Sequence, residues 1–184
     1  NNYTLETWFR SVDESEQTMF SAVDSASKNY YVNLGLTDEG KVSWTHKGVT
    51  LISADEFAGP GQPWHHLAVV YNDGAMTMYV NGSIAGELVG EASINDKVEI
   101  VLGKNGPIDH TKFFKGYLDD FRIWDRAVDW ETIRSKNDLT LRGSEENLVA
   151  YWKLDEVEGD NIFDLTDNKF HGTTCNINRS ELFA

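Results

Sequence analysis

The sequence is poor in cysteine, proline and long apolar runs. Its 184 residues include one cysteine and three prolines. The single cysteine, Cys175, excludes an intrachain disulfide bond but does not decide the compartment, because many secreted domains also lack disulfides. No window approaches eighteen consecutive apolar residues, so we expect no helix that spans a bilayer.

Basic residues are also scarce. Lysine and arginine number 16 against 30 aspartates and glutamates, which gives a formal net charge of −14. A chain this acidic repels phosphate backbones and anionic lipids, so we expect neither nucleic acid nor membrane insertion. Neutral ligands and divalent cations are better partners. Hydrophobic residues at 40% and aromatic residues at 12% exclude a disordered or fibrous protein.

Apolar residues recur with a period of two, which is typical of β-strands. This alternation predicts strands at residues 3–9, 30–36, 41–45, 98–102 and 148–154. Residues 64–71 and 75–80 flank an Asn-Asp-Gly turn and predict a hairpin, which residues 84–89 continue as a third strand. One short helix is predicted at residues 129–135, where Asp129 can cap it and Trp130 and Ile133 would share its buried face.

Many short strands and the absence of a linker or repeat predict one all-β domain. We expect an antiparallel two-sheet sandwich, or jelly roll, with one short helix. The chain starts at Asn1, without Met and directly in a strand-like run. We therefore expect a single domain over residues 1–184, taken from a larger multidomain protein.

Three stretches in the expected order carry a family resemblance. Residues 64–82 contain WHHLAVVY, the Asn-Asp-Gly turn and MYVNG, and this resembles a hairpin of laminin-G-like and pentraxin-like domains. Residues 116–127 (GYLDDFRIWDRA) are similar to a late strand of those domains, and residues 148–155 (LVAYWKLD) with the loop up to Gly172 are similar to their closing segment. The resemblance implies a concanavalin A-like jelly roll of two curved sheets.

The chain departs from the family pattern at its start, where the family's leading strand is missing. Either that strand lies outside this sequence or residues 155–172 take its place. In the closing loop Asp167 replaces an expected glycine.

Exposed aromatic side chains are the candidate ligand-binding residues. Proteins recognise neutral sugars by stacking aromatic rings on the apolar C–H face and by bonding the hydroxyls. Trp8 lies on an otherwise polar face of its strand. A second such face is predicted on residues 31–46. The predicted ligand-binding residues are Trp8, Tyr31, Trp44 and His46.

Clustered carboxylates are the candidate metal ligands. Calcium prefers six to eight oxygen ligands from carboxylates and loop carbonyls, and acidic residues crowd between positions 155 and 167. The resemblance implies that calcium links an aspartate of the late strand to loop oxygens. We therefore predict a structural calcium at Asp119, Asp120, Asp164 and Asp167. The alternative is that these residues are turn caps and solvated charges.

No catalytic motif stands out in the sequence. The paired carboxylates on one strand that related glucanases use are missing, so we expect no enzyme. His65 and His66 are adjacent on a strand and point to opposite faces, so they are not expected to share a metal ion, and His66 is expected to be a hydrogen-bonded structural histidine.

The resemblance implies a non-catalytic recognition module of an extracellular or cell-surface protein. Its ligand would be a glycan or a protein surface, and neighbouring domains of its parent chain would adjoin it. The alternatives are a structural spacer whose aromatic residues pack on neighbouring domains, or an accessory module of a glycan-active enzyme.

Overall fold

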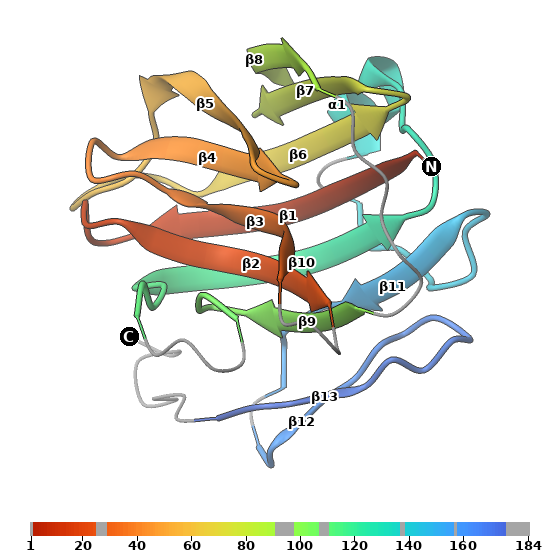
Figure 1. Ribbon diagram of the computed structural model, residues 1–184. Coiled ribbons are helices and arrows are strands. Elements are labelled where there is room, and N and C mark those ends of the chain that lie inside the picture. Colours follow the sequence, from red (N-terminus) through yellow and green to blue (C-terminus); the bar gives the residue numbers. More distant parts are fainter. Residues whose placement is uncertain are drawn as a thin grey trace.

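The computed structural model describes residues 2–24, 29–90, 98–106, 111–136, 139–156 and 158–175. Two antiparallel sheets pack face to face, and one short helix lies outside them (Figure 1). The prediction of an all-β sandwich with one short helix is therefore confirmed. The six-stranded sheet contains, in order, β11 (Leu148–Trp152), β10 (Gly116–Trp124), β1 (Tyr3–Ser11), β6 (His65–Asn72), β7 (Ala75–Val80) and β8 (Ser83–Val89).

The second sheet has five strands. In order they are β5 (Val49–Glu56), β4 (Lys41–His46), β3 (Tyr30–Leu36), β2 (Gln17–Asp24) and β9 (Val98–Leu102). A separate two-stranded hairpin of β12 (Asn161–Ile162) and β13 (Gly172–Thr173) lies at the lower end in Figure 1.

The predicted three-stranded meander of β6, β7 and β8 is confirmed, and its turns explain it. Asp73 and Gly74 have φ angles of 48° and 92°, and Asn81 and Gly82 have φ angles of 50° and 73°. Two consecutive positive φ angles make the tight turn whose twist matches antiparallel strands.

Apart from the two-residue strands β12 and β13, two strands, β2 and β5, have no counterpart in the sequence prediction. Seven consecutive residues of β2 are buried, so its apolar residues do not alternate with solvated ones. In β5 the buried Leu51 and Ser53 alternate with exposed neighbours, but Ile52 is among the exposed ones and obscures the pattern.

Alternate residues of the six-stranded sheet point into two different clusters. Leu67 and Val69 of β6 belong to the main core between the sheets, where Phe20 stacks on Phe121 at 5.1 Å between ring centroids. Ala68 and Val70 point to the opposite, outer face and pack in a second cluster.

Helix α1 (Trp130–Lys136) covers part of this outer face. The Oδ1 atom of Asp129 accepts a hydrogen bond from the Thr132 amide at 2.8 Å, which confirms the predicted cap. Ile133 is 1% exposed and packs on the sheet. Trp130 is 39% exposed, so the prediction that it shares the buried face is wrong; its indole instead donates to the Gly82 carbonyl at 2.8 Å.

The segment after β11 returns along that strand. Asp164 forms a β-bridge with Trp152, and the amide of Leu165 donates to the Tyr151 carbonyl at 2.9 Å. Among the described residues, no helix has the length and apolar character needed to cross a membrane.

Candidate ligand-binding face

Two of the four predicted ligand-binding residues lie in the core. Trp44 and His46 have no solvent exposure. The Tyr3 hydroxyl lies 2.9 Å from Nδ1 of His46, and burial lowers the pKa of this histidine to about 4, so it is neutral at physiological pH. The prediction that these two side chains belong to an exposed face is wrong, because their strand turns that side toward the other sheet.

Trp8 and Tyr31 are both half-buried but lie on different sheets. The Tyr31 hydroxyl donates to Oδ2 of Asp24 at 3.1 Å, and the Lys47 ammonium lies 5.2 Å from the centre of its ring. Trp8 lies on the outer face of the six-stranded sheet, where its ring contacts His66 at 5.4 Å between centroids. The four predicted residues therefore do not form one site.

Trp8 instead belongs to an aromatic strip, which we define as Trp8, Arg10, Trp64 and Tyr117. Arg10 faces the same way as Trp8 because it lies two residues further along β1. Its guanidinium carbon lies 4.4 Å from the centre of the Tyr117 ring and 5.8 Å from that of Trp64. Trp64 is 38% exposed, and its ring centre is 6.1 Å from that of Tyr117. The strip thus crosses β10, β1 and the residue that precedes β6.

A buried ionic network lies next to the strip on the same face. Glu6 is 4% exposed, and its Oε2 atom lies 3.3 Å from Nε2 of His66 and 3.8 Å from Nη1 of Arg122. Arg122 also bonds Oδ2 of Asp120 at 3.2 Å, and the Tyr151 hydroxyl donates to the other oxygen of Asp120. Burial first, and then the bond to Asp120, raise the pKa of Tyr151. His66 is buried beside Glu6, but neither of its ring nitrogens forms a hydrogen bond with a described residue, so the prediction of a hydrogen-bonded histidine is not confirmed. His65 contacts Phe9 on the other face of the strand.

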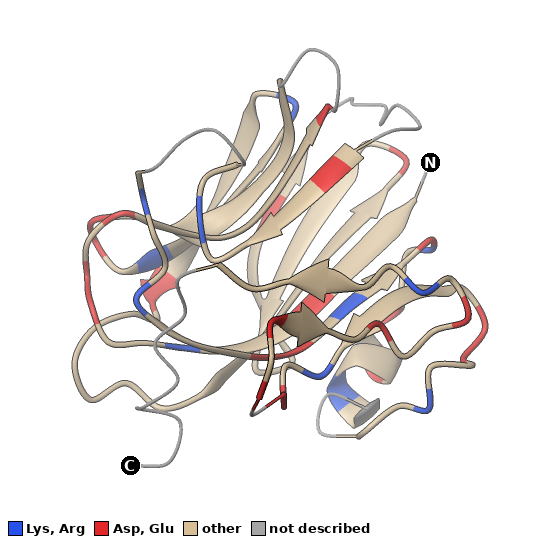
Figure 2. Ribbon diagram, turned by 90° about the horizontal axis from the view of Figure 1, so that it is seen from below, with Lys and Arg blue, Asp and Glu red and all other residues tan. Residues whose placement is uncertain are grey.

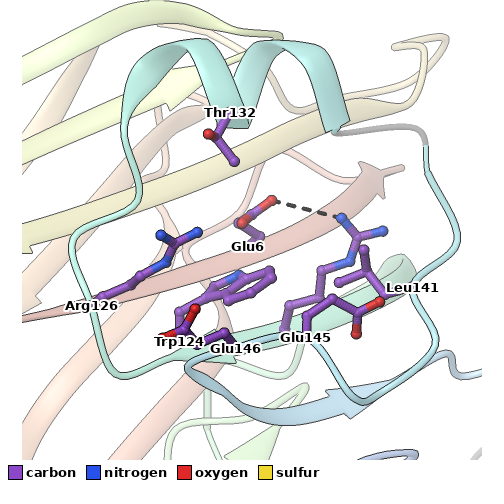
Figure 3. A pocket seen from close by; sticks show the side chains of 8 residues that line it. Glu6, Trp124, Arg126, Thr132, Leu141, Glu145 and Glu146 are labelled. Carbon is purple, nitrogen blue, oxygen red and sulfur yellow. Dashed lines mark ion pairs between the residues drawn. The ribbon is translucent and has the colours of Figure 1, made fainter.

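A pocket of about 250 Å³ opens between this network and helix α1 (Figure 3). The sheet contributes Glu6 from β1 and Arg122 and Trp124 from β10, and the helix contributes Thr132. The remaining lining residues are Arg126, Leu141, Glu145 and Glu146.

Hydrogen-bond donors of Trp124 and Arg126 in the pocket lining have no partner among the described residues. Trp124 is only 7% exposed, and neither its Nε1 atom nor the Nε atom of Arg126 bonds any described residue. In Figure 3 both side chains reach toward the space that Glu6 borders. Glu145 is already engaged, because its two oxygens accept the amides of Arg142 and Gly143 at 2.8 and 2.9 Å. These backbone bonds outweigh partial burial and hold the pKa of Glu145 below its usual range.

The structure does not gather the four predicted calcium ligands around one point. In the described part of the chain, no three acidic, histidine or cysteine side chains are placed to hold a metal. Asp164 is 1% exposed, and its two oxygens accept hydrogen bonds from the amides of Tyr151, Thr166 and Phe170 and from the Thr166 hydroxyl, at 2.8–3.0 Å. Both oxygens of Asp120 are also bonded, and Asp167 is exposed.

Asp119 is a carboxyl group of this face whose pKa is clearly raised. Burial first, and then the charges of Asp120 and Asp155, raise the pKa of Asp119 from 3.8 to about 6. Its Oδ1 atom accepts the amide of Asp120 at 2.9 Å, and it lies opposite Trp8 in the strand register. Other acidic residues lie on loops on several sides of the molecule (Figure 2).

The sequence prediction missed Arg10, Tyr117, Trp124 and Arg126 as candidate binding residues. Two-residue alternation from Trp8 indicates that Arg10 shares its face. Which β10 residues lie beside Trp8 and Arg10 depends on how β1 pairs with β10, and this pairing includes a bulge between Glu6 and Trp8. A local pattern in a single sequence does not indicate such a pairing register.

Comparison with known proteins identifies the family. The model of the concanavalin A-like lectin/glucanases superfamily matches residues 1–134. The chain therefore belongs to this superfamily, and the family resemblance found in the sequence is confirmed.

Two curated relatives share about a quarter of their aligned residues with the chain. Pentraxin-related protein PTX3 of Mus musculus is 23% identical over 163 residues, which are 82% of this chain and 42% of that protein. Adhesion G-protein coupled receptor V1 of Danio rerio is 24% identical over 183 residues, 91% of this chain and 3% of the receptor. The chain thus spans less than half the length of each relative.

Solved structures share the fold at low identity. A proposed carbohydrate binding protein of Bacteroides ovatus superposes with a TM-score of 0.73 and 19% identity, over 94% of this chain and 51% of the other. A SAP-like pentraxin of Limulus polyphemus gives a TM-score of 0.63 and 20% identity, over 96% and 85%. Domain 4 of an extracellular arabinanase of Geobacillus stearothermophilus, in complex with arabinotriose, gives a TM-score of 0.56 and 18% identity, over 73% of this chain and 66% of the other. These likenesses concern the fold alone.

Proposed function

We propose that this domain is a non-catalytic recognition module that binds uncharged oligosaccharides on the outer face of its six-stranded sheet. The observation that carries the proposal is the aromatic strip, in which two half-exposed rings flank the guanidinium of Arg10. Aromatic rings stack on the C–H faces of sugars, and a guanidinium held in place can bond neighbouring hydroxyls. Solved relatives with this fold include a domain in complex with arabinotriose, which supports a glycan ligand.

The dimensions of the strip favour an oligosaccharide over a single ring. It crosses three neighbouring strand positions, which are roughly 4.8 Å apart, and extends from Arg10 to Trp8, roughly 7 Å along β1. Its Arg10 Nε atom is buried without a hydrogen-bond partner in the described structure. A sugar hydroxyl would supply the missing acceptor.

The charge distribution supports an uncharged ligand, and the carboxylates nearby support binding without hydrolysis. A net charge of −14 disfavours polyanionic glycans. Glycoside hydrolysis needs a carboxylic acid and a second free carboxylate facing the scissile bond. Asp119 has the raised pKa of such an acid, but its neighbour Asp120 is held by Tyr151 and Arg122.

We also infer an extracellular or cell-surface location, since one relative is an adhesion receptor.

A glycan array followed by titration calorimetry tests the proposal. Trp64→Ala should weaken binding of any array hit at least tenfold, because it removes the most exposed ring of the strip. Trp130→Ala is a matched control: Trp130 is 39% exposed against 38% for Trp64 but lies on helix α1, outside the strip. Equal losses in both variants would contradict the assigned site.

Two further outcomes separate the alternatives. A blank array, with and without calcium, favours a structural spacer over a recognition module. Release of reducing ends from a bound oligosaccharide would contradict the non-catalytic assignment.

A further inference from the structure

We propose that the pocket between helix α1 and β10 is a second, separate site that takes one uncharged sugar ring. The inference rests on the proposed function, because it assigns the same class of ligand to another part of the outer face. The pocket is lined from β1, β10, α1 and the segment around Glu145, and the strip residues Arg10, Trp64 and Tyr117 are not among its lining residues.

The unpaired donors of the pocket call for an acceptor. The indole N–H of Trp124 is more than nine-tenths buried and, like Nε of Arg126, bonds no described residue. A buried donor without an acceptor is unfavourable, so a ligand oxygen that accepts from both groups would be bound there. The Thr132 hydroxyl donates to Oδ2 of Asp129 at 2.8 Å, and neither of the two donors bonds its oxygen.

The charges around the pocket argue against an ionic ligand. The lining contains the carboxylates of Glu6, Glu145 and Glu146 and the guanidiniums of Arg122 and Arg126. The excess of negative charge in the lining would repel an anion, and a cation would leave the two N–H donors without an acceptor. A hydroxyl group satisfies both sides, because it accepts from an N–H and donates to a carboxylate.

The size and the apolar part of the lining favour a single sugar ring. About 250 Å³ is smaller than the roughly 300–1,000 Å³ of pockets that hold drug-sized ligands. Leu141 and the indole of Trp124, over which the Arg126 guanidinium carbon lies 5.7 Å from the ring centre, form the apolar part of the lining.

Nuclear magnetic resonance of the native protein tests the site directly. The chain has six tryptophans, and their indole N–H signals are separately visible after 15N labelling. Trp124→Phe identifies the Trp124 signal. Titration with glucose, galactose and mannose should shift this signal for at least one sugar, and the corresponding uronic acid at neutral pH should bind at least tenfold more weakly. No shift of the Trp124 signal with any of the three hexoses, or equal binding of the uronic acid, would overturn the inference.

Two arginine variants give the matched test. Arg126→Gln should weaken binding of the hexose about tenfold, which corresponds to 1.4 kcal/mol. Arg134→Gln is the control, since Arg134 is an exposed residue of the neighbouring helix α1 and does not line the pocket. Equal affinities of the Arg126 and Arg134 variants would also count against the site.

The same experiments distinguish failure of this site from failure of the proposed function. If oligosaccharide binding depends on Trp64 while no hexose shifts the Trp124 signal, the recognition function stands and the pocket inference falls. If a hexose shifts the Trp124 signal while Trp64→Ala changes nothing, the pocket stands and the strip falls. If no sugar binds at either place, both are wrong.

Discussion

Replacement of Arg122 by methionine should be among the most destabilising single changes on the outer face of the sheet. The Arg122 side chain is 2% exposed, and its Nη2 atom bonds Asp120 at 3.2 Å and the Leu139 carbonyl at 2.7 Å. Its Nη1 atom lies 3.8 Å from Glu6, whose side chain is 5% exposed. Methionine keeps much of the volume but leaves both carboxylates without their cation.

The magnitude follows from the burial of the pair. Removal of one partner of a buried ion pair costs about 3–5 kcal/mol, because a charge remains in a poorly solvated place. In a domain of this length each kcal/mol lowers the melting temperature by about 2–4 °C. Arg122→Met should therefore lower it by roughly 6–20 °C.

Urea unfolding of Arg122→Met and of a surface control measures this difference. Lys112 lies 2.7 Å from Glu16, but these side chains are 41% and 57% exposed. Lys112→Met should cost less than about 1 kcal/mol, because solvent already screens that pair. If both variants lose the same small free energy of unfolding, the Arg122 network is effectively solvated and the reasoning is refuted.

Three further predictions concern carboxylates. Asp119→Asn should stabilise the fold at pH 8 and change little near pH 4: the folded pKa of about 6 exceeds 3.8, so the folded state loses stability as pH rises between these values. The rise in the Asp119 pKa corresponds to about 3 kcal/mol of lost stability. Because the carboxyl is only half-buried, contact with solvent reduces this to about 1 kcal/mol. Equal effects of Asp119→Asn on urea unfolding at both pH values would contradict the prediction. Asp164→Asn should cost about 1–3 kcal/mol above pH 5 and less in acid. Burial raises the pKa of Asp164, but backbone and hydroxyl hydrogen bonds outweigh it and hold the pKa below its usual value, so their stabilisation is lost as the pH falls through the folded pKa. A cost that does not change with pH in urea unfolding would argue against this. Calcium binding stays a prediction from the sequence: millimolar calcium should raise the melting temperature more than magnesium does, and a chelator should reverse the effect. A melting temperature that responds to neither calcium nor chelator would show that this prediction is wrong.

The fold was largely predictable from local patterns, and particular elements show why. The Asp73-Gly74 and Asn81-Gly82 turns define their hairpins through backbone preferences that two residues carry by themselves. The helix cap at Asp129 is similarly local. Strand β2 was not predictable, because its burial on both faces removes the alternation.

The candidate site was predictable only where it depends on one strand. Trp8 was found from the alternation along β1. Trp44 was misassigned because alternation separates two faces without telling which of them meets the other sheet. Aspartate is a common metal ligand, yet Asp164 instead accepts hydrogen bonds from the backbone of its own loop and of Tyr151. This role becomes visible only in the structure, where the loop packs back against β11.

Strand β1 explains how one sheet can serve both stability and recognition. Leu5 and Phe9 point into the main core, whereas Glu6, Trp8 and Arg10 point to the outer face. Because the two sets alternate, side chains on the outer face can change without opening a cavity between the sheets. Glu6 is the exception, since its charge is buried with Arg122 and a change there affects folding as well as the pocket. The proposed sugar specificity should therefore vary more readily at Trp8 and Arg10 than at Glu6.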